Sequence, residues 1–285
     1  RGKEMEREEK DISFFQRYLT LWVLLCMGVG VFLGKVFPQM TSFVASLQIE
    51  GISVPIAILI WLMIYPMMIK VDFESVKEVG KNPKGLFVTW ITNWLIKPFT
   101  MFGISYLFFF IIFKNLIPQE LAKDYLAGAV LLGAAPCTAM VFVWSTLTKG
   151  DPAYTLVQVA TNDLIILVAF IPIVKFLLGV SKVIVPYKTL FVSVLLFVAI
   201  PLLAGVITRK YLVGKRGREY FEKEFVNKFD GITTIGLLLT LVLIFSSQAN
   251  VIVENPMHII LIGIPLILQT IFIFSIAYLA CKVLG

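Results

Sequence analysis

Long apolar runs alternate with short polar segments along almost the whole chain. Runs of roughly 20 apolar residues without ionised side chains are typical of transmembrane helices. The pattern therefore predicts an all-α polytopic membrane protein with about eight spans. The predicted spans are Leu19–Phe37, Ile52–Ile69, Leu86–Phe113, Tyr125–Leu147, Tyr154–Leu178, Thr189–Ile207, Ile232–Ser247 and His258–Cys281. The third run is long enough to predict a tilted or irregular helix.

Two prolines add local detail to these spans. Asp151 followed by Pro152 predicts a helix start, with the aspartate as N-cap and the proline at the first helical position. Lys97 precedes Pro98 inside the third span, and this proline predicts a bend there.

Composition and charge agree with a membrane protein. Of all residues 59% are hydrophobic and 15% are charged, against roughly 25% charged in soluble domains. The net charge of +7 lies in short loops, so it is better explained by membrane orientation than by a nucleic-acid partner. With a cytoplasmic N-terminus, 18 of the 25 Lys and Arg residues fall on the cytoplasmic side, 6 fall outside, and Lys97 lies within a span. We predict a multi-pass protein of the cell membrane with that orientation.

The cysteines and the absent motifs exclude several chemistries. Cys26, Cys137 and Cys281 all lie in apolar runs, and an odd, scattered set argues against a disulfide framework or a structural zinc site. The sequence has no P-loop, no zinc-peptidase motif and no paired intramembrane histidines for haem. We therefore expect no cofactor and no nucleotide-driven pumping.

A proline–cysteine pair interrupts the predicted fourth span. Pro136 lacks a backbone donor and clashes with the preceding turn, so it predicts a helix break. Lipid tolerates such a break only where protein or a water-filled cavity covers the freed backbone groups. Cys137 is then either a small buried hydrophobe, as free cysteines often are, or a soft ligand at a transport site. Thr138 would bond a freed carbonyl or line that site.

Two ionisable side chains lie at a similar depth. Lys97, Cys137 and Asp163 are each about ten to twelve residues into a span, which places them near the bilayer centre. A buried carboxylate is costly unless it is paired, hydrated or protonated. Asp163 is therefore a candidate proton carrier or a partner of Lys97 in an ion pair, and both roles are compatible. The alternative for Lys97 is extension of its side chain to the membrane interface.

Amide side chains accompany these groups. Gln158 and Asn162 are spaced i, i+4 and share a helix face, as do Thr89 and Asn93 on the third span. Such amides either bond the hydroxyls of a substrate or hold helices together. We expect packing or interfacial roles for four tryptophans, which are Trp61, Trp90, Trp94 and Trp144.

Several segments together form a recognisable pattern. They are Ala134–Ser145 (AAPCTAMVFVWS), Lys149–Ala160 (KGDPAYTLVQVA) followed by Asn162-Asp163-Leu164, Arg17–Trp22 (RYLTLW) and Asn93–Phe99 (NWLIKPF). This pattern resembles the arsenical-resistance arsenite efflux permeases, which belong to the bile acid/arsenite/riboflavin transporter superfamily. The resemblance covers essentially the whole chain.

The resemblance implies a particular fold and transport cycle. It implies ten spans in two inverted five-helix repeats, with a broken fourth helix in each repeat and the two breaks crossing at the centre. Residues 1–180 would form the first repeat and residues 181–285 part of the second, so this chain would hold about eight of the ten spans. The resemblance also implies export of As(III) by proton exchange, with an essential cysteine at the position of Cys137. Related sodium/proton antiporters carry an acidic pair where this chain has Asn162 and Asp163.

These inferences combine into one functional hypothesis. Soft thiolates select soft centres such as As(III), so Cys137 is expected to bind the transported metalloid. Protons would be coupled through Asp163 and Lys97. The remaining residues expected at the substrate site are Pro136, Thr138, Asn162, Gln158 and Asn93. Antimonite is left open as a further substrate.

Three alternatives remain at this point. The nearest is a sodium-coupled organic-anion symporter of the same fold, which would need oxygen-lined sodium sites and no thiol. An intramembrane enzyme with Cys137 as nucleophile would need a nearby base, and no intramembrane histidine is available. A non-transporting membrane scaffold would be indifferent to changes of Cys137 and Asp163. We predict a transporter and not an enzyme.

Overall fold

The computed structural model describes residues 18–49, 51–71, 83–137, 141, 144–145, 148–184 and 186–284. These residues are helical apart from connections and a two-stranded hairpin, in which Gln48 pairs with Ser53. The first part of the chain forms α3 (Leu19–Val36), α4 (Pro38–Ser46), β1 (Gln48–Ile49), β2 (Ile52–Ser53), α5 (Val54–Met68), α7 (Lys84–Trp90), η1 (Ile91–Ile96), α8 (Lys97–Tyr106), η2 (Leu107–Ile112) and α9 (Gln119–Ala134). The second part forms α11 (Pro152–Val180), α12 (Tyr187–Val194), η3 (Leu195–Ala199), α13 (Ile200–Arg216), α14 (Arg218–Tyr220), η4 (Phe221–Phe225), η5 (Val226–Phe229), α15 (Asp230–Ser247), α16 (Ala249–Glu254) and α17 (Pro256–Leu284).

The predicted all-α polytopic architecture is confirmed. Within the described ranges, six helical stretches are long and apolar enough to cross a membrane. They correspond to the first, third, fifth, sixth, seventh and eighth predicted spans. The second, α5, has 15 residues, and the fourth, α9, has 16. Helix α9 begins at Gln119, before the predicted start of the fourth span at Tyr125. Charged residues there lie in the first helical turns, where they can extend out of the membrane.

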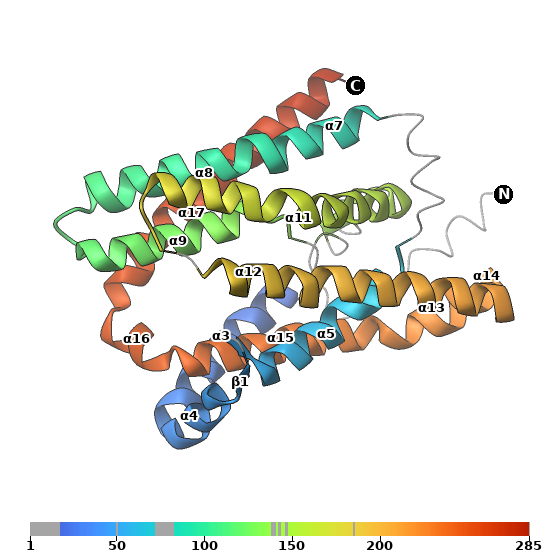
Figure 1. Ribbon diagram of the computed structural model, residues 1–285, viewed down its shortest axis with the longest axis horizontal. Helices are drawn as coiled ribbons and strands as arrows, with labels where there is room; N and C mark the ends of the chain where they lie inside the picture. Colours follow the sequence, from blue (N-terminus) through green and yellow to red (C-terminus); the bar gives the residue numbers. More distant parts are fainter. Residues whose placement is uncertain are drawn as a thin grey trace.

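The helices form two layers (Figure 1). In one layer, α15 packs against α3 and α5, and α13 packs against α5. In the other, α8 packs against α9 and α17, and α11 packs against α9. The two layers meet where α11 contacts α12 and η3. The layers do not follow the predicted halves 1–180 and 181–285. Instead, the first two spans of each predicted repeat lie in one layer.

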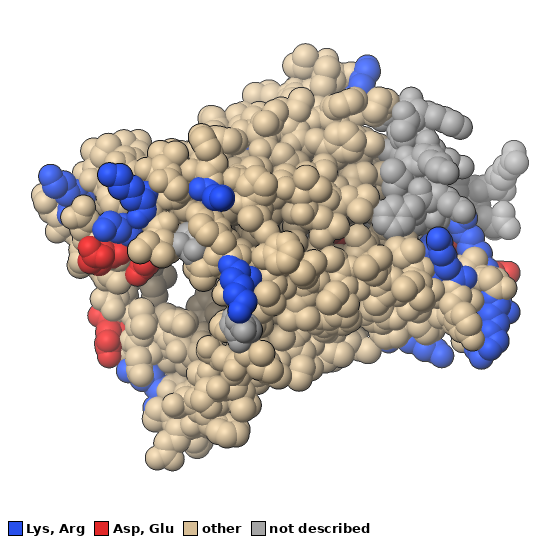
Figure 2. Space-filling model, in the orientation of Figure 1, with Lys and Arg blue, Asp and Glu red and all other residues tan. Residues whose placement is uncertain are grey.

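Charged side chains gather at the two ends of the molecule, on either side of a middle band that is mostly uncharged (Figure 2). At one end, Lys84 Nζ donates to the carbonyl of Leu284 (3.1 Å), and Arg209 donates to the carbonyl of Lys70 (3.4 Å). Three of the segments predicted to be cytoplasmic are therefore represented at this end. Successive long helices run alternately toward one end of the molecule and then the other, as the predicted order of spans requires (Figure 1).

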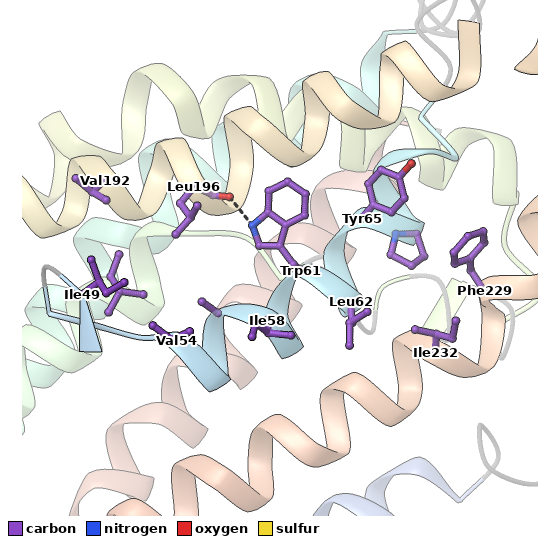
Figure 3. A pocket seen from close by; sticks show the side chains of 13 residues that line it. Ile49, Val54, Ile58, Trp61, Leu62, Tyr65, Val192, Leu196, Phe229 and Ile232 are labelled. Atoms are coloured by element: carbon purple, nitrogen blue, oxygen red, sulfur yellow. Dashed lines mark hydrogen bonds between the residues drawn. The ribbon is translucent and has the colours of Figure 1, made fainter. Parts of the chain in front are cut away.

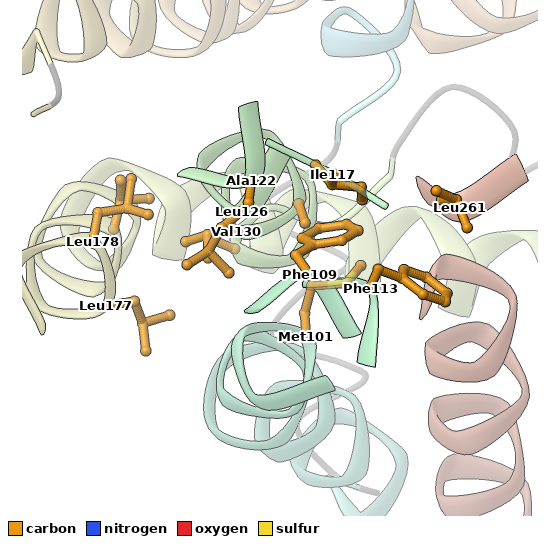
Figure 4. Close-up of a cluster of buried hydrophobic side chains, with 13 residues drawn as sticks. Met101, Phe109, Phe113, Ile117, Ala122, Leu126, Val130, Leu177, Leu178 and Leu261 are labelled. Carbon is orange, nitrogen blue, oxygen red and sulfur yellow. The ribbon is translucent and has the colours of Figure 1, made fainter. Parts of the chain in front are cut away.

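A buried apolar cluster holds α9 against its neighbours (Figure 4). Phe109 from η2, Leu126 and Val130 from α9, and Leu178 from α11 are each at most 1% exposed. Gly133 of α9 approaches α8 so closely that an added Cβ would lie 2.6 Å from Met101 Cβ. This packing holds the end of α9 against Met101, which lies one helical turn after Lys97 on α8.

Candidate functional site

The predicted helix break at Pro136 is confirmed. Helix α9 ends at Ala134, and Ala135 has extended backbone angles, φ −119° and ψ 139°. Pro136 and Cys137 continue without helical structure. Proline has no backbone N–H to donate to the helix, and its ring clashes with the preceding turn. The Cys137 side chain is exposed, so it is not a small buried hydrophobe. Thr138 lies outside the described residues, and its two roles stay predictions.

Lys97 bonds directly to the broken end of α9. Its Nζ donates to the carbonyl of Ala135 at 2.6 Å, a short charge-assisted hydrogen bond. This bond satisfies a carbonyl that the break frees within the predicted membrane interior. The ammonium also lies within electrostatic reach of Cys137. The half-buried side chain thus stays at the break instead of extending to the interface, and it makes no ion pair with Asp163 among the described residues.

The third span is irregular at the predicted place. A π-helical segment, η1 (Ile91–Ile96), precedes Lys97, whose backbone N–H donates to the carbonyl of Thr92. Pro98 follows in the first turn of α8. Segments of π-helix inside α-helices often occur at functional sites. Here the side chains of Asn93 and Trp94 in this segment bond Asn162 of α11.

Asn162 of α11 is held by the third span. Its Oδ1 accepts hydrogen bonds from Trp94 Nε1 (2.9 Å) and Asn93 Nδ2 (3.3 Å), and its Nδ2 donates to the carbonyl of Gln158 (2.8 Å). The side chain is 4% exposed. In this conformation its Oδ1 therefore joins α11 to the third span, and its Nδ2 bonds within α11. The same network occupies the Nδ2 of Asn93, which the sequence pattern predicts to lie beside the substrate.

These contacts also bear on the expected roles of Trp94 and Gln158. Trp94 packs in a buried apolar cluster with Ile166 and Val194, which confirms its predicted packing role, and its Nε1 also bonds Asn162. Gln158 donates its Nε2 to the carbonyl of Gly85 (3.1 Å), and its buried Oε1 has no partner among the described residues. Trp144 is 55% exposed, as expected for an interfacial residue.

Asp163 is a buried carboxylate with unused hydrogen-bonding capacity. It is 2% exposed, and its Oδ2 has no partner among the described residues. A charge in such a position is unfavourable unless it is neutralised by a proton or a bound ion. Its neighbour Asn162 bonds the π-helical turn, so the carboxyl group lies at the level where α11 meets the third span.

Sequence reasoning missed Gln269 of α17. Its Nε2 donates to the Lys97 carbonyl (3.1 Å) and to Thr100 Oγ1 (2.8 Å), and the residue is 3% exposed. The available signal was a lone amide near the centre of an apolar helix of 29 residues. The criterion of depth within a span, which selected Lys97 and Asp163, would have identified Gln269 if it had also been applied to amide side chains.

An apolar cavity of about 560 Å³ lies in the other layer (Figure 3). It lies between α5, α12, η3 and α15, and Trp61 Nε1 beside it donates to the carbonyl of Leu196 at 3.0 Å. Its lining contains no residue of the predicted transport site. Within the described part of the chain, no group of three or more His, Cys, Asp or Glu side chains could hold a metal ion.

A broken helix and buried polar side chains at mid-depth define this molecule as a polytopic protein of the secondary-transporter class. Residues 57–255 match the Sodium Bile acid symporter family. The chain is 61% identical over 277 residues to "Arsenical-resistance protein Acr3" of Alkaliphilus metalliredigens, which covers 97% of this chain and 78% of the relative. It is 33% identical over 285 residues to the protein of that name from Corynebacterium glutamicum, covering 96% and 74%. "Uncharacterized transporter slr0944" of Synechocystis is 42% identical over 94% of this chain and 72% of the relative. The chain belongs to the Sodium Bile acid symporter family and, within it, to the Acr3 arsenical-resistance family, whose members are transporters and not enzymes.

Proposed function

We propose that this chain exports arsenite by secondary active transport, with As(III) bound at Cys137. The names of two relatives, at 61% and 33% identity, support the substrate. The observation that carries the proposed site is the end of α9 at Ala134, which leaves an exposed thiol on non-helical backbone beside Lys97.

The chemistry of arsenous acid suits a single thiol. As(OH)₃ is mostly neutral at pH 7, so it can enter a low-dielectric site without a counter-ion. The thiol displaces one hydroxyl: the S–H bond and one As–O bond break, an As–S bond forms, and water leaves, with no change of oxidation state. A site with three thiolates would hold As(III) too tightly for release, whereas one As–S bond reverses by hydrolysis. Contacts from Thr138 and Gln158 to the remaining hydroxyls complete the proposed site.

Proton coupling is assigned to Asp163. Its buried carboxyl group has an unpartnered oxygen, which favours a neutral, protonated form when the site is closed to water. The carboxyl group binds a proton from the outside and releases it to the cytoplasm as arsenous acid leaves. Lys97, which bonds Ala135 in this conformation, competes with that proton if its ammonium swings toward Asp163. Movement of one layer against the other would provide alternating access.

A second candidate is the sodium-coupled organic-anion symporter. The family description and one relative at 24% identity, "Uncharacterized sodium-dependent transporter YocS" of Bacillus subtilis, support this alternative. The exposed thiol beside a cation favours arsenite instead. We also place the protein in the cell membrane with its N-terminus cytoplasmic, as the 18-to-6 distribution of Lys and Arg supports.

Arsenite uptake into everted membrane vesicles tests the proposal in the intact protein. Cys137→Ser should abolish uptake driven by a pH gradient, and the matched control Cys281→Ser should retain it. Asp163→Asn should uncouple uptake from the gradient. Normal transport by Cys137→Ser would contradict the thiol role, and retained coupling in Asp163→Asn would contradict the proton role. A strict requirement for sodium would favour the symporter.

A further inference from the structure

Gln269 connects α17 to the irregular turn of the third span. Its Nε2 bonds both the Lys97 carbonyl and the Thr100 hydroxyl, at 3.1 and 2.8 Å. The two acceptors lie in the first turn of α8, directly after η1. One buried amide therefore fixes the backbone of the residue whose ammonium bonds the broken end of α9.

These contacts form a continuous chain of bonds. Gln269 holds the main chain of Lys97, and Lys97 Nζ holds the Ala135 carbonyl at 2.6 Å. Two residues after Ala135 comes Cys137, on backbone without helical hydrogen bonds. Because the helix ends at Ala134, this bond to Lys97 ties the first residue of the break to α8. A change at Gln269 thus reaches the thiol through two hydrogen bonds.

The geometry differs from that of a simple interhelical clamp. A buried amide that only joins two helices usually satisfies both its donor and its acceptor. The Oε1 of Gln269 is buried and has no partner among the described residues. Leaving such an acceptor unpaired carries a desolvation cost, so stability alone gives little reason for an amide here.

We propose that Gln269 is a positioning residue of the transport site, which sets the backbone of Lys97 and thereby the position of Cys137. The inference builds on the proposed function, in which Cys137 binds the substrate. Gln269 does not contact the thiol itself. Its effect on substrate affinity arises through Lys97 and the Ala135 carbonyl.

Gln269→Met tests this role, since methionine has similar length and shape but makes neither bond. Thr270→Val is the matched control: Thr270 is exposed on the same helix, and among the described residues its hydroxyl bonds only the carbonyl of Leu266, within α17. The first readout is alkylation of Cys137 by N-ethylmaleimide in membranes, with Cys26→Ser and Cys281→Ser in the background. We expect Gln269→Met to speed alkylation roughly threefold or more, because the break segment loses its anchor.

The second readout is arsenite transport. We expect KM to rise roughly tenfold with Vmax nearly unchanged, since two hydrogen bonds that order the binding site are lost. A merely structural role would instead lower Vmax through loss of folded protein and leave both KM and alkylation unchanged, which would overturn the inference. Alkylation needs no arsenite. If Gln269→Met speeds alkylation while the wild-type protein carries no arsenite, the proposed function fails and the positioning role survives.

Discussion

The contact of α3 with α15 depends on the absence of side chains at two glycines. A Cβ added to Gly34 would lie 2.5 Å from Ala249 Cβ and would overlap the Ser246 carbonyl oxygen. One turn earlier, a Cβ added to Gly30 would lie 2.7 Å from the Val242 carbonyl oxygen. The spacing i, i+4 places both glycines on one face, as in the small-residue contacts of membrane helices.

The cost of Gly34→Ala follows from these distances. Ordinary contact begins at 3.4 Å, so the two backbones would have to separate by about 1 Å. Such overpacking costs about 1–3 kcal/mol. Gly28 of the same helix has nothing within 4 Å of an added Cβ, so Gly28→Ala should gain the usual helix preference of alanine, about 0.5–1 kcal/mol. The two variants should therefore differ by roughly 1.5–4 kcal/mol.

Thermal unfolding in detergent, followed by size-exclusion chromatography of the heated protein, measures this difference. With about 2–4 °C per kcal/mol for a protein of this size and a cost of about 1–3 kcal/mol, Gly34→Ala should lower the apparent Tm by roughly 2–12 °C. Gly28→Ala should raise it by about 2 °C. Equal Tm values for the two variants would show that α3 and α15 do not pack as closely as described.

Two further predictions concern the buried network and the orientation. Trp94→Phe removes the 2.9 Å bond to Asn162 and should destabilise the protein by about 1 kcal/mol, whereas Trp144→Phe, at an exposed position, should leave the Tm unchanged; equal losses would argue against the network. In intact cells, Lys114→Cys should react with a membrane-impermeant maleimide and Lys215→Cys should not, and the reverse result would invert the proposed topology.

Local signals in the sequence were sufficient to predict those backbone features that a single residue determines. Asp151 accepts from the N–H groups of Ala153 (2.8 Å) and Tyr154 (3.2 Å), as an N-cap should. Pro136 ends α9, and the third span is irregular beside Pro98. These effects arise within one helical turn, so no knowledge of neighbouring helices is needed.

Side-chain partners could not be predicted in the same way. Depth in the span placed Lys97 and Asp163 together, but the structure gives Lys97 the Ala135 carbonyl as its partner. The free carbonyl exists only because α9 breaks, and it is near Lys97 only because Gly133 lets α9 approach α8. Such a pairing depends both on a local helix break and on the packing of helices that are distant in the sequence. The spacing of residues in the sequence predicts the break but not the packing.

The long-range hydrogen bonds within each layer bear on how the site could move. In the layer of α5 and α13, Trp61 bonds Leu196 and Tyr65 bonds Thr208 (2.7 Å). In the layer of the break, the bonds of Lys97, Asn162 and Gln269 join the third span to α9, α11 and α17. Each of these long-range bonds thus stays within one layer.

Apolar contacts join the two layers. Among the described residues, one cluster contains Met68, Val71, Ala160 and Leu202, and another contains Trp94, Ile166 and Val194. Hydrophobic contacts are non-directional and tolerate sliding better than hydrogen bonds of fixed geometry. The bonded site could therefore travel as a unit against the other layer, so that Cys137, Lys97 and Gln269 keep their mutual geometry while access alternates. This requires the positioning bonds to lie inside the moving layer, which is where the structure has them.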